Sequence, residues 1–204
     1  GDVEHILKDA LIHIRQKYGD RVRFEFFGAL PSFAKALGAR CIPYCDSYDE
    51  YRRTLNALEW DIGLAPMPDT PFHACKHYNK FVEYAAAGVV GVFSDVEPYA
   101  RLKSRGSPGL YCKNRSEEWE DAIEELIENN VMRADCRKEA CSFLACEMSV
   151  AQSATAFEPL LHHIDYTRDK ISIFIIVLGK ILNIVLLIRS KIRRKWKHET
   201  DRKH

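Results

Sequence analysis

Two lysines and a glutamate between residues 76 and 83 share one stripe of a predicted helix. Lys76, Lys80 and Glu83 occupy positions i, i+4 and i+7 of an alanine-rich segment, 76–87, that ends at Gly88, and this spacing places them on one helix face. Lys76 would lie near the helix N-terminus, where a cation is disfavoured unless an anion is bound. Free amide groups and the lysine would then converge on that anion. The natural candidate is a diphosphate.

Each of these residues also has a simpler interpretation. Lys80 could be a solvated surface lysine, and Glu83 could form an ion pair with it at i, i+3 spacing. His73 lies in the loop before the helix, where it could touch a sugar or phosphate or be an ordinary polar loop residue. Tyr44 ends a predicted strand, 41–44, where it could flank a nucleotide base or lie on a surface turn. The residues alone leave these alternatives open.

The cysteine and histidine spacings do not predict a metal site. Cys41 and Cys45 have CxxxC spacing, and His73, Cys75 and His77 lie close together in the sequence. A zinc site needs tight ligand pairs in a fixed geometry, whereas the first pair is expected at a strand end and the trio at the start of a helix. We therefore expect no metal.

Other classes of chemistry lack their motifs. The sequence contains no Ser–His–Asp order and no GxxxxGK[ST] loop, which argues against a hydrolase or a kinase. Seven cysteines, an odd number, are scattered through a chain that shows no secretory signal. This pattern predicts free thiols in a reducing cytoplasm and no disulfide framework.

Strands are expected to alternate with helices. The apolar periodicity predicts helices over 2–17, 48–58, 76–87 and 116–129, and strands over 22–28, 41–44, 61–66, 89–93 and 109–112. Ser94 and Glu97 have capping-box spacing for a further helix that runs to about Arg105, and Ser116 is expected to cap the acidic helix. Residues 133–165 should add one or two helices.

This order of elements predicts an α/β fold with a Rossmann-like, doubly wound parallel sheet that is covered on both faces. A sheet of this kind usually opens with a strand, whereas this sequence opens with a helix. We therefore expect the first strand to lie upstream and to be missing here.

The central run DIGLAPMPDTPFHACKHYNKFVEYAAAGVVGVFSDVEPY, residues 61–99, resembles the donor-binding segment of GT-B glycosyltransferases of the retaining, family-4-like group. The flanking FFG, GLYC and EEWEDAIEEL segments agree in order, so the resemblance covers about residues 1–150. It implies a C-terminal domain that binds a nucleotide-diphosphate sugar, a UDP- or GDP-sugar, and transfers the sugar with retention and without a metal. It also implies a separate N-terminal domain that binds the acceptor and is absent here.

The resemblance assigns roles to individual residues. Many members carry two glutamates separated by seven residues, and Glu83 matches the second, which typically contacts the donor ribose. The first position is Cys75 here, and a subgroup with lysine at the next position implies a phosphate-facing role for Lys76. Lys76 and Glu83 are thus the implied catalytic residues. The implied donor-binding residues are His73, Lys76, Lys80, Glu83 and Tyr44.

The charge of the chain is unevenly distributed. Of its 204 residues 47% are hydrophobic and 29% are charged, which excludes a collagen-like or wholly disordered chain. Residues 1–170 carry 21 Lys and Arg against 27 Asp and Glu, and residues 171–204 carry 9 against 2. An acidic body does not suit a nucleic-acid-binding domain, so we expect no nucleic-acid partner.

The basic tail predicts contact with a membrane. Residues 171–188 are nearly all apolar, and the basic run 189–197 follows directly. We expect residues 166–204 to form a helix that lies in the interface of an anionic membrane, next to a domain over 1–165. A membrane-spanning helix and a helix packed on a protein partner are the alternatives.

Together with the basic tail, the resemblance implies a glycosyltransferase domain, peripheral to the cytoplasmic face of the cell membrane, that serves cell-envelope polysaccharide synthesis. Its acceptor would be a glycan or a lipid-linked sugar. The alternatives are a truncated or non-catalytic membrane-attached module that binds nucleotide sugars, and a purely structural interaction domain.

Overall fold

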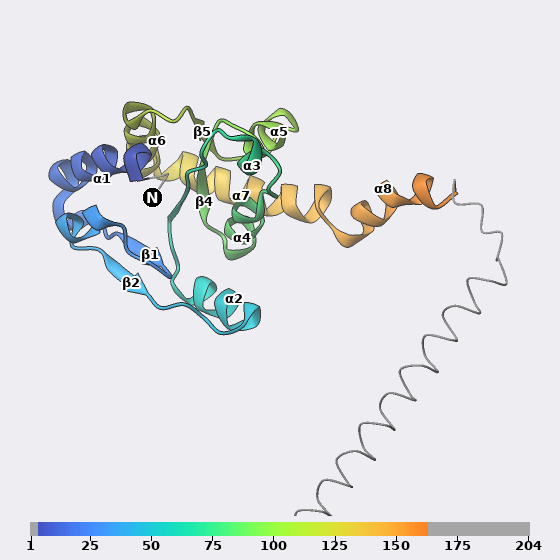
Figure 1. Ribbon diagram of the computed structural model, residues 1–204, viewed down its shortest axis with the longest axis horizontal. Helices are drawn as coiled ribbons and strands as arrows, with labels where there is room; N and C mark the ends of the chain where they lie inside the picture. Colours follow the sequence, from blue (N-terminus) through green and yellow to red (C-terminus); the bar gives the residue numbers. More distant parts are fainter. Residues whose placement is uncertain (1–3, 163–204) are drawn as a thin grey trace, which may run out of the picture. The chain divides into compact units, whose positions relative to one another are not determined.

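The computed structural model describes residues 4–162 of the chain, and Figure 1 shows the order of its elements. The chain divides into two compact units, 1–153 and 154–204. The elements in chain order are α1 (Glu4–Tyr18), η1 (Gly19–Arg21), β1 (Glu25–Phe27), η2 (Ser32–Leu37), β2 (Arg40–Ile42), α2 (Tyr48–Ala57), β3 (Ile62–Ala65), α3 (Pro71–Ala74), α4 (Asn79–Ala87), β4 (Val90–Ser94), α5 (Tyr99–Ser104), β5 (Leu110–Cys112), α6 (Ser116–Glu128), α7 (Asn130–Glu147) and α8 (Val150–His162).

The predicted α/β class is confirmed, but the strands form two small parallel sheets. β1 pairs with β2, and β4 lies between β3 and β5 in a three-stranded sheet. The sequence predicts one continuous sheet, whereas no ladder joins β1 to β3 within residues 4–162.

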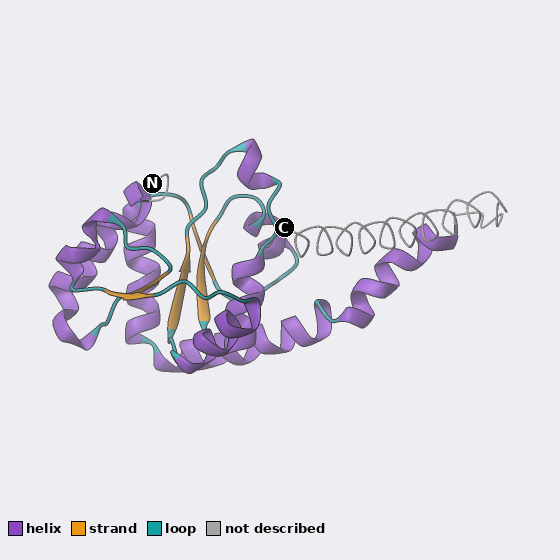
Figure 2. Cartoon of the chain, turned by 60° about the horizontal axis from the view of Figure 1, so that its bottom comes forward, coloured by secondary structure: helices purple, strands orange, loops and turns teal. Residues whose placement is uncertain are grey.

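The three-stranded sheet is covered on both faces, and Figure 2 shows its strands between helices. Alternate residues of each strand enter different apolar clusters, as expected for a period of two. The cluster shared with α1 and α6 takes Ile62, Leu64, Val90, Val92, Leu110 and Cys112. The cluster shared with α4, α5 and α7 takes Ala65, Phe93 and Tyr111. This alternation is the pattern of a doubly covered parallel sheet.

Helices α1 and α6 pack side by side on the first face. Six buried positions of α1 follow helical spacing: Ile6, Leu7, Ala10, Leu11, Ile14 and Tyr18. Polar pairs then bridge the two helices at intervals of about one turn: His13–Glu120 at 2.8 Å, Lys17–Glu124 at 2.6 Å and, from η1, Arg21–Glu128 at 3.7 Å. Apolar burial joins the helices, and the polar pairs along the rim are consistent with a single register.

An aromatic cluster around Phe93 organises the second face. The Phe93 ring lies 4.9 Å from the ring of Tyr99, 5.5 Å from Tyr111 and 5.9 Å from Phe81, measured between centroids. The same ring covers Gly91, where a Cβ would lie 2.0 Å from the Phe93 ring. The cluster therefore fixes α4, α5 and β5 against β4 and needs glycine at position 91.

Several helix boundaries differ from the sequence predictions. The helix predicted over 48–58 is α2, which the Ser47 hydroxyl caps. The helices predicted over 133–165 correspond to most of α7 and to all of α8. The capping box of Ser94 and Glu97 does not form, because Ser94 ends β4 and α5 begins at Tyr99. Ser116 also does not cap α6, since its hydroxyl accepts the backbone N–H of Ala10 in α1.

The membrane predictions fall largely outside the structure. The apolar segment 171–188 and the basic run 189–197 lie outside the described residues. Within residues 4–162, no helix has both the length and the apolar character that crossing a membrane requires.

We expect Gly91→Ala to lower the free energy of unfolding by about 1–3 kcal/mol, the usual cost of overpacking. The added methyl group would displace the Phe93 ring from its aromatic neighbours. Chemical denaturation of the full chain measures the loss, with Phe93→Leu as the second variant. Because the smaller side chain makes room, Gly91→Ala should cost less in the Phe93→Leu background, and an equal cost there would contradict this packing.

The His13–Glu120 pair predicts a pH dependence of stability. The hydrogen bond and charge of Glu120 raise the pKa of His13. The pair therefore stabilises the folded chain below the ordinary pKa of histidine, and this contribution is lost as pH rises through the raised value. In the wild-type chain the pair raises the denaturation midpoint in mildly acidic buffer relative to mildly alkaline buffer. This part of the difference between the two midpoints should disappear in both His13→Gln and Glu120→Gln. Unchanged pH dependence in both variants would show that the pair contributes nothing.

Candidate functional site

A cavity of about 330 Å³ lies at the carboxyl end of β3. Its wall combines the end of β3 and the following loop with side chains from α3, α4, α5 and the α3–α4 loop. The lining residues are Leu64, Ala65, Pro66, Met67, Pro68, His73, Lys76, Lys80 and Tyr99. Loops beyond the carboxyl ends of parallel strands are the usual place for ligands in folds of this class.

The predicted helix 76–87 is interrupted, and this changes the position of Lys76. Thr70 caps α3 through its hydroxyl, Pro71 occupies the first turn, and Cys75 ends this short helix. α4 then begins at Asn79, so Lys76 lies between the helices and not on the α4 stripe. The prediction that one helix carries both lysines is therefore wrong, although both side chains line the cavity.

The sequence carries a signal for the start of α3, although not for the break that follows it. A threonine followed by proline is typical of an N-cap and the first helical position, and Thr70–Pro71 follows that pattern. The Lys76 ammonium lies 4.9 Å from the centroid of the Phe72 ring, a cation–π contact within the same loop region.

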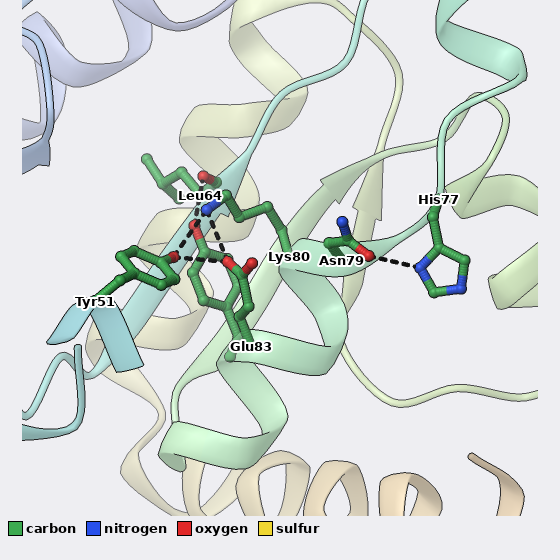
Figure 3. Close-up of polar contacts among 7 residues, drawn as sticks. Tyr51, Leu64, His77, Asn79, Lys80 and Glu83 are labelled. Atoms are coloured by element: carbon green, nitrogen blue, oxygen red, sulfur yellow. Dashed lines mark hydrogen bonds and ion pairs between the residues drawn. The ribbon is translucent and has the colours of Figure 1, made fainter. Parts of the chain in front are cut away.

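Lys80, Glu83 and Tyr51 form a three-way polar contact, in which Figure 3 shows the side chains pointing toward one another. The Lys80 ammonium donates to Glu83 Oε2 at 2.7 Å and to the Tyr51 hydroxyl at 2.9 Å. Tyr51 itself donates to Glu83 Oε2 at 2.6 Å. The Glu83 side chain is only 15% exposed, against 46% for Lys80. The ion pair that local spacing allowed is thus present, and it includes a tyrosine from α2.

Burial raises the pKa of two tyrosines in this region still further above neutral pH. Burial first, and then the hydrogen bond to Glu83, raise the pKa of Tyr51. Burial also raises the pKa of Tyr84, whose hydroxyl donates to the Leu64 carbonyl at 2.9 Å. Both hydroxyls therefore act as hydrogen-bond donors at neutral pH.

Of the two remaining predicted site residues, His73 lies in the cavity and Tyr44 lies outside its lining. His73 lines the cavity, with its Nδ1 2.8 Å from the Thr70 hydroxyl oxygen. Tyr44 is 85% exposed, and its ring lies against Gly28 beyond the end of β1. The structure therefore brings His73, Lys76 and Lys80 together, places Glu83 behind Lys80, and leaves Tyr44 outside the cavity lining.

A buried hydroxyl network holds the cavity wall. Ser94 Oγ, at the end of β4, accepts the Met67 backbone N–H at 2.7 Å and donates to Asn114 Oδ1 at 2.7 Å. Asn114 Nδ2 donates to the Met67 carbonyl at 2.8 Å. These three bonds join the end of β4 to the loops that follow β3 and β5. Local spacing predicts a helix cap at Ser94, and no local signal in the sequence points to Asn114.

The cavity is suited to an anion. Among the described residues that line it, three carry basic nitrogen atoms and none carries a carboxylate. This contrasts with the acidic balance of residues 1–170. Across residues 4–162, no group of three or more His, Cys, Asp or Glu side chains could hold a metal ion.

No family model matches this chain, and no curated protein matches it in sequence. The likeness of residues 61–99 to the donor-binding segment of glycosyltransferases therefore stays a prediction.

Ser94→Ala should lower the free energy of unfolding by about 1–3 kcal/mol, because it leaves the Met67 N–H and Asn114 Oδ1 without their shared partner. Chemical denaturation of the full chain measures the change. Ser104→Ala is the matched control, since its hydroxyl donates to the Arg101 carbonyl at an exposed position, and we expect a change within about 0.5 kcal/mol. Equal effects of the two substitutions would contradict the role of the network.

Proposed function

We propose that this chain binds a nucleotide-diphosphate sugar, with the diphosphate in the cavity formed by His73, Lys76 and Lys80. The observation that carries the proposal is the lining itself: basic side chains converge at the carboxyl end of a parallel strand, without a carboxylate among the described lining residues. Cationic side chains are the usual partners of phosphate oxygens.

The size of the cavity fits part of such a ligand. Ligand sites commonly enclose about 300–1,000 Å³, so a cavity of about 330 Å³ can enclose the diphosphate but leaves little room for a whole nucleotide sugar. The nucleoside and the sugar would extend out of it along the carboxyl edge of the sheet.

The proposed reaction is glycosyl transfer with retention to a glycan or lipid-linked acceptor, as in cell-envelope polysaccharide synthesis. The bond between the anomeric carbon and the diphosphate oxygen breaks, and its electron pair leaves with the diphosphate. The acceptor oxygen bonds to the same face of that carbon, and its proton passes to the departing diphosphate oxygen. Lys76 and Lys80 would stabilise the charge that develops on the leaving group without a metal. Glu83 Oε1 would accept a hydrogen bond from a ribose hydroxyl.

A non-catalytic module that binds nucleotide sugars is the second candidate. It is favoured by the state of Glu83, whose Oε2 already accepts hydrogen bonds from Lys80 and Tyr51 and is therefore less available to take part in a reaction. Sugar transfer measured with the chain alone and with an added acceptor-binding domain separates the candidates. Turnover in either case supports the enzyme, and binding without turnover in both supports the module.

Membrane attachment belongs to the same proposal. The basic run 189–197 would bind anionic lipid at the cytoplasmic face, close to a lipid-linked acceptor. Co-sedimentation with vesicles that contain anionic lipid tests this directly. Binding that persists with purely zwitterionic vesicles would contradict an electrostatic attachment.

Calorimetric titration of the full chain with UDP and GDP tests the site. Lys76→Ala should weaken binding about tenfold or more, because a hydrogen bond to a charged group contributes roughly 1.5–3 kcal/mol and about 1.4 kcal/mol is tenfold. Lys80→Ala should weaken it less, since Glu83 offsets the charge of Lys80.

Lys138→Ala is the matched control for both substitutions. Lys138 is an exposed lysine of α7 that lines a different groove, so its removal should leave nucleotide affinity unchanged. Binding that is insensitive to Lys76→Ala, or lost equally in the control, would overturn the proposed site.

A further inference from the structure

Tyr51 reaches the cavity residues from a separate part of the fold. It belongs to α2, 29 residues before Lys80 in the sequence, and its ring packs edge-on against Phe27 of β1 with the centroids 4.8 Å apart. Through this ring the hydroxyl is held over the first turn of α4. Figure 3 shows Tyr51 entering from one side and the α4 residues from the other.

The hydroxyl can serve both partners at once. It has one proton, which it donates to Glu83 Oε2 at 2.6 Å, and its oxygen then accepts from the Lys80 ammonium at 2.9 Å. The same ammonium lies 5.2 Å from the centroid of the Tyr51 ring. Lys80 thus has two fixed acceptors behind it, the tyrosine oxygen and the carboxylate.

These contacts determine how many N–H groups of the Lys80 ammonium remain to bind a ligand. An ammonium has three N–H donors, and two of them are taken by Tyr51 and Glu83. The third remains to contact a ligand in the cavity, which Lys80 lines. A free lysine loses rotamer entropy when it is fixed, and the contacts with Tyr51 and Glu83 meet part of this cost before a ligand arrives.

We propose that Tyr51 is a positioning residue, which holds the Lys80 ammonium so that its remaining N–H points to the diphosphate. This inference rests on the proposed function and adds α2 to the site. Tyr51 acts through Lys80 and does not itself contact the phosphate oxygens.

A double-mutant cycle tests the proposal on the full chain, with UDP and inorganic pyrophosphate as the probes in calorimetric titrations. Tyr51→Phe keeps the ring against Phe27 and removes only the hydroxyl. We expect it to weaken both probes about two- to threefold in the wild-type background, less than Lys80→Ala itself does, because it acts only through Lys80 and the lower end of a net hydrogen-bond contribution sets the scale. In the Lys80→Ala background it should change neither affinity, because the residue through which it acts is gone.

The possible outcomes separate this inference from the proposed function. An equal loss in both backgrounds would assign Tyr51 a general structural role and overturn the inference, and so would no loss in either. A loss with UDP alone would place the hydroxyl on the nucleoside and also overturn it. Absence of wild-type binding to either probe would overturn the proposed function and this inference together.

Tyr48→Phe is the matched control. Tyr48 lies on the same helix, 65% exposed, with its ring 6.2 Å from that of Tyr51, and its substitution should leave both affinities unchanged. If Tyr51→Phe lowers the free energy of unfolding, Glu83→Gln is the second variant. It removes the carboxylate charge behind Lys80 while keeping an amide oxygen there, and it should change pyrophosphate affinity only while Lys80 is present, whereas an equal change in the Lys80→Ala background would contradict the proposal.

Discussion

The packing of Phe93 over Gly91 is the constraint on which the second face of the sheet depends. A side chain at position 91 cannot coexist with the ring, since a Cβ would lie 2.0 Å from it. Seated there, the ring contacts Phe81 of α4, Tyr99 of α5 and Tyr111 of β5. One side chain thereby sets the distance of three elements from the central strand.

The geometry of the candidate site depends on that packing. Phe81 and Tyr99 fix the starts of α4 and α5, so Lys80 and the Tyr99 ring meet at the cavity. Ser94, the residue after Phe93, faces the carboxyl edge and binds the loop at Met67. Adjacent residues of β4 thus hold the core and the cavity wall. A substitution that shifts the core should therefore also change the positions of the residues that line the cavity.

The periodic parts of the fold could be predicted from the sequence. The alternation of strands and helices and the apolar face of α1 follow from local patterns, and the strand expected over 89–93 is β4. The expectation that Lys76 belongs to α4 was wrong, because Thr70 and Pro71 begin a separate short helix, α3, and the chain is not helical from Cys75 to Tyr78. A capping box at Ser94 was also wrong, because a hydroxyl can satisfy a tertiary partner as readily as a local one.

Other features have no local signal. Tyr51 meets Glu83 across 32 positions of sequence, and only the packing of α2 against α4 brings them together. The division into two sheets likewise depends on which strands are neighbours in space. Lys80 and Glu83, by contrast, could be paired from their spacing alone.

The central claim is that the cavity formed by His73, Lys76 and Lys80 holds a diphosphate. An experimental structure of the full chain in complex with UDP tests it most directly. The account predicts the diphosphate in this cavity, with its oxygens within hydrogen-bond distance of the Lys76 and Lys80 ammonium groups and Tyr51 still bound to Lys80. A diphosphate bound elsewhere, such as the groove beside Lys138 on α7, would contradict it.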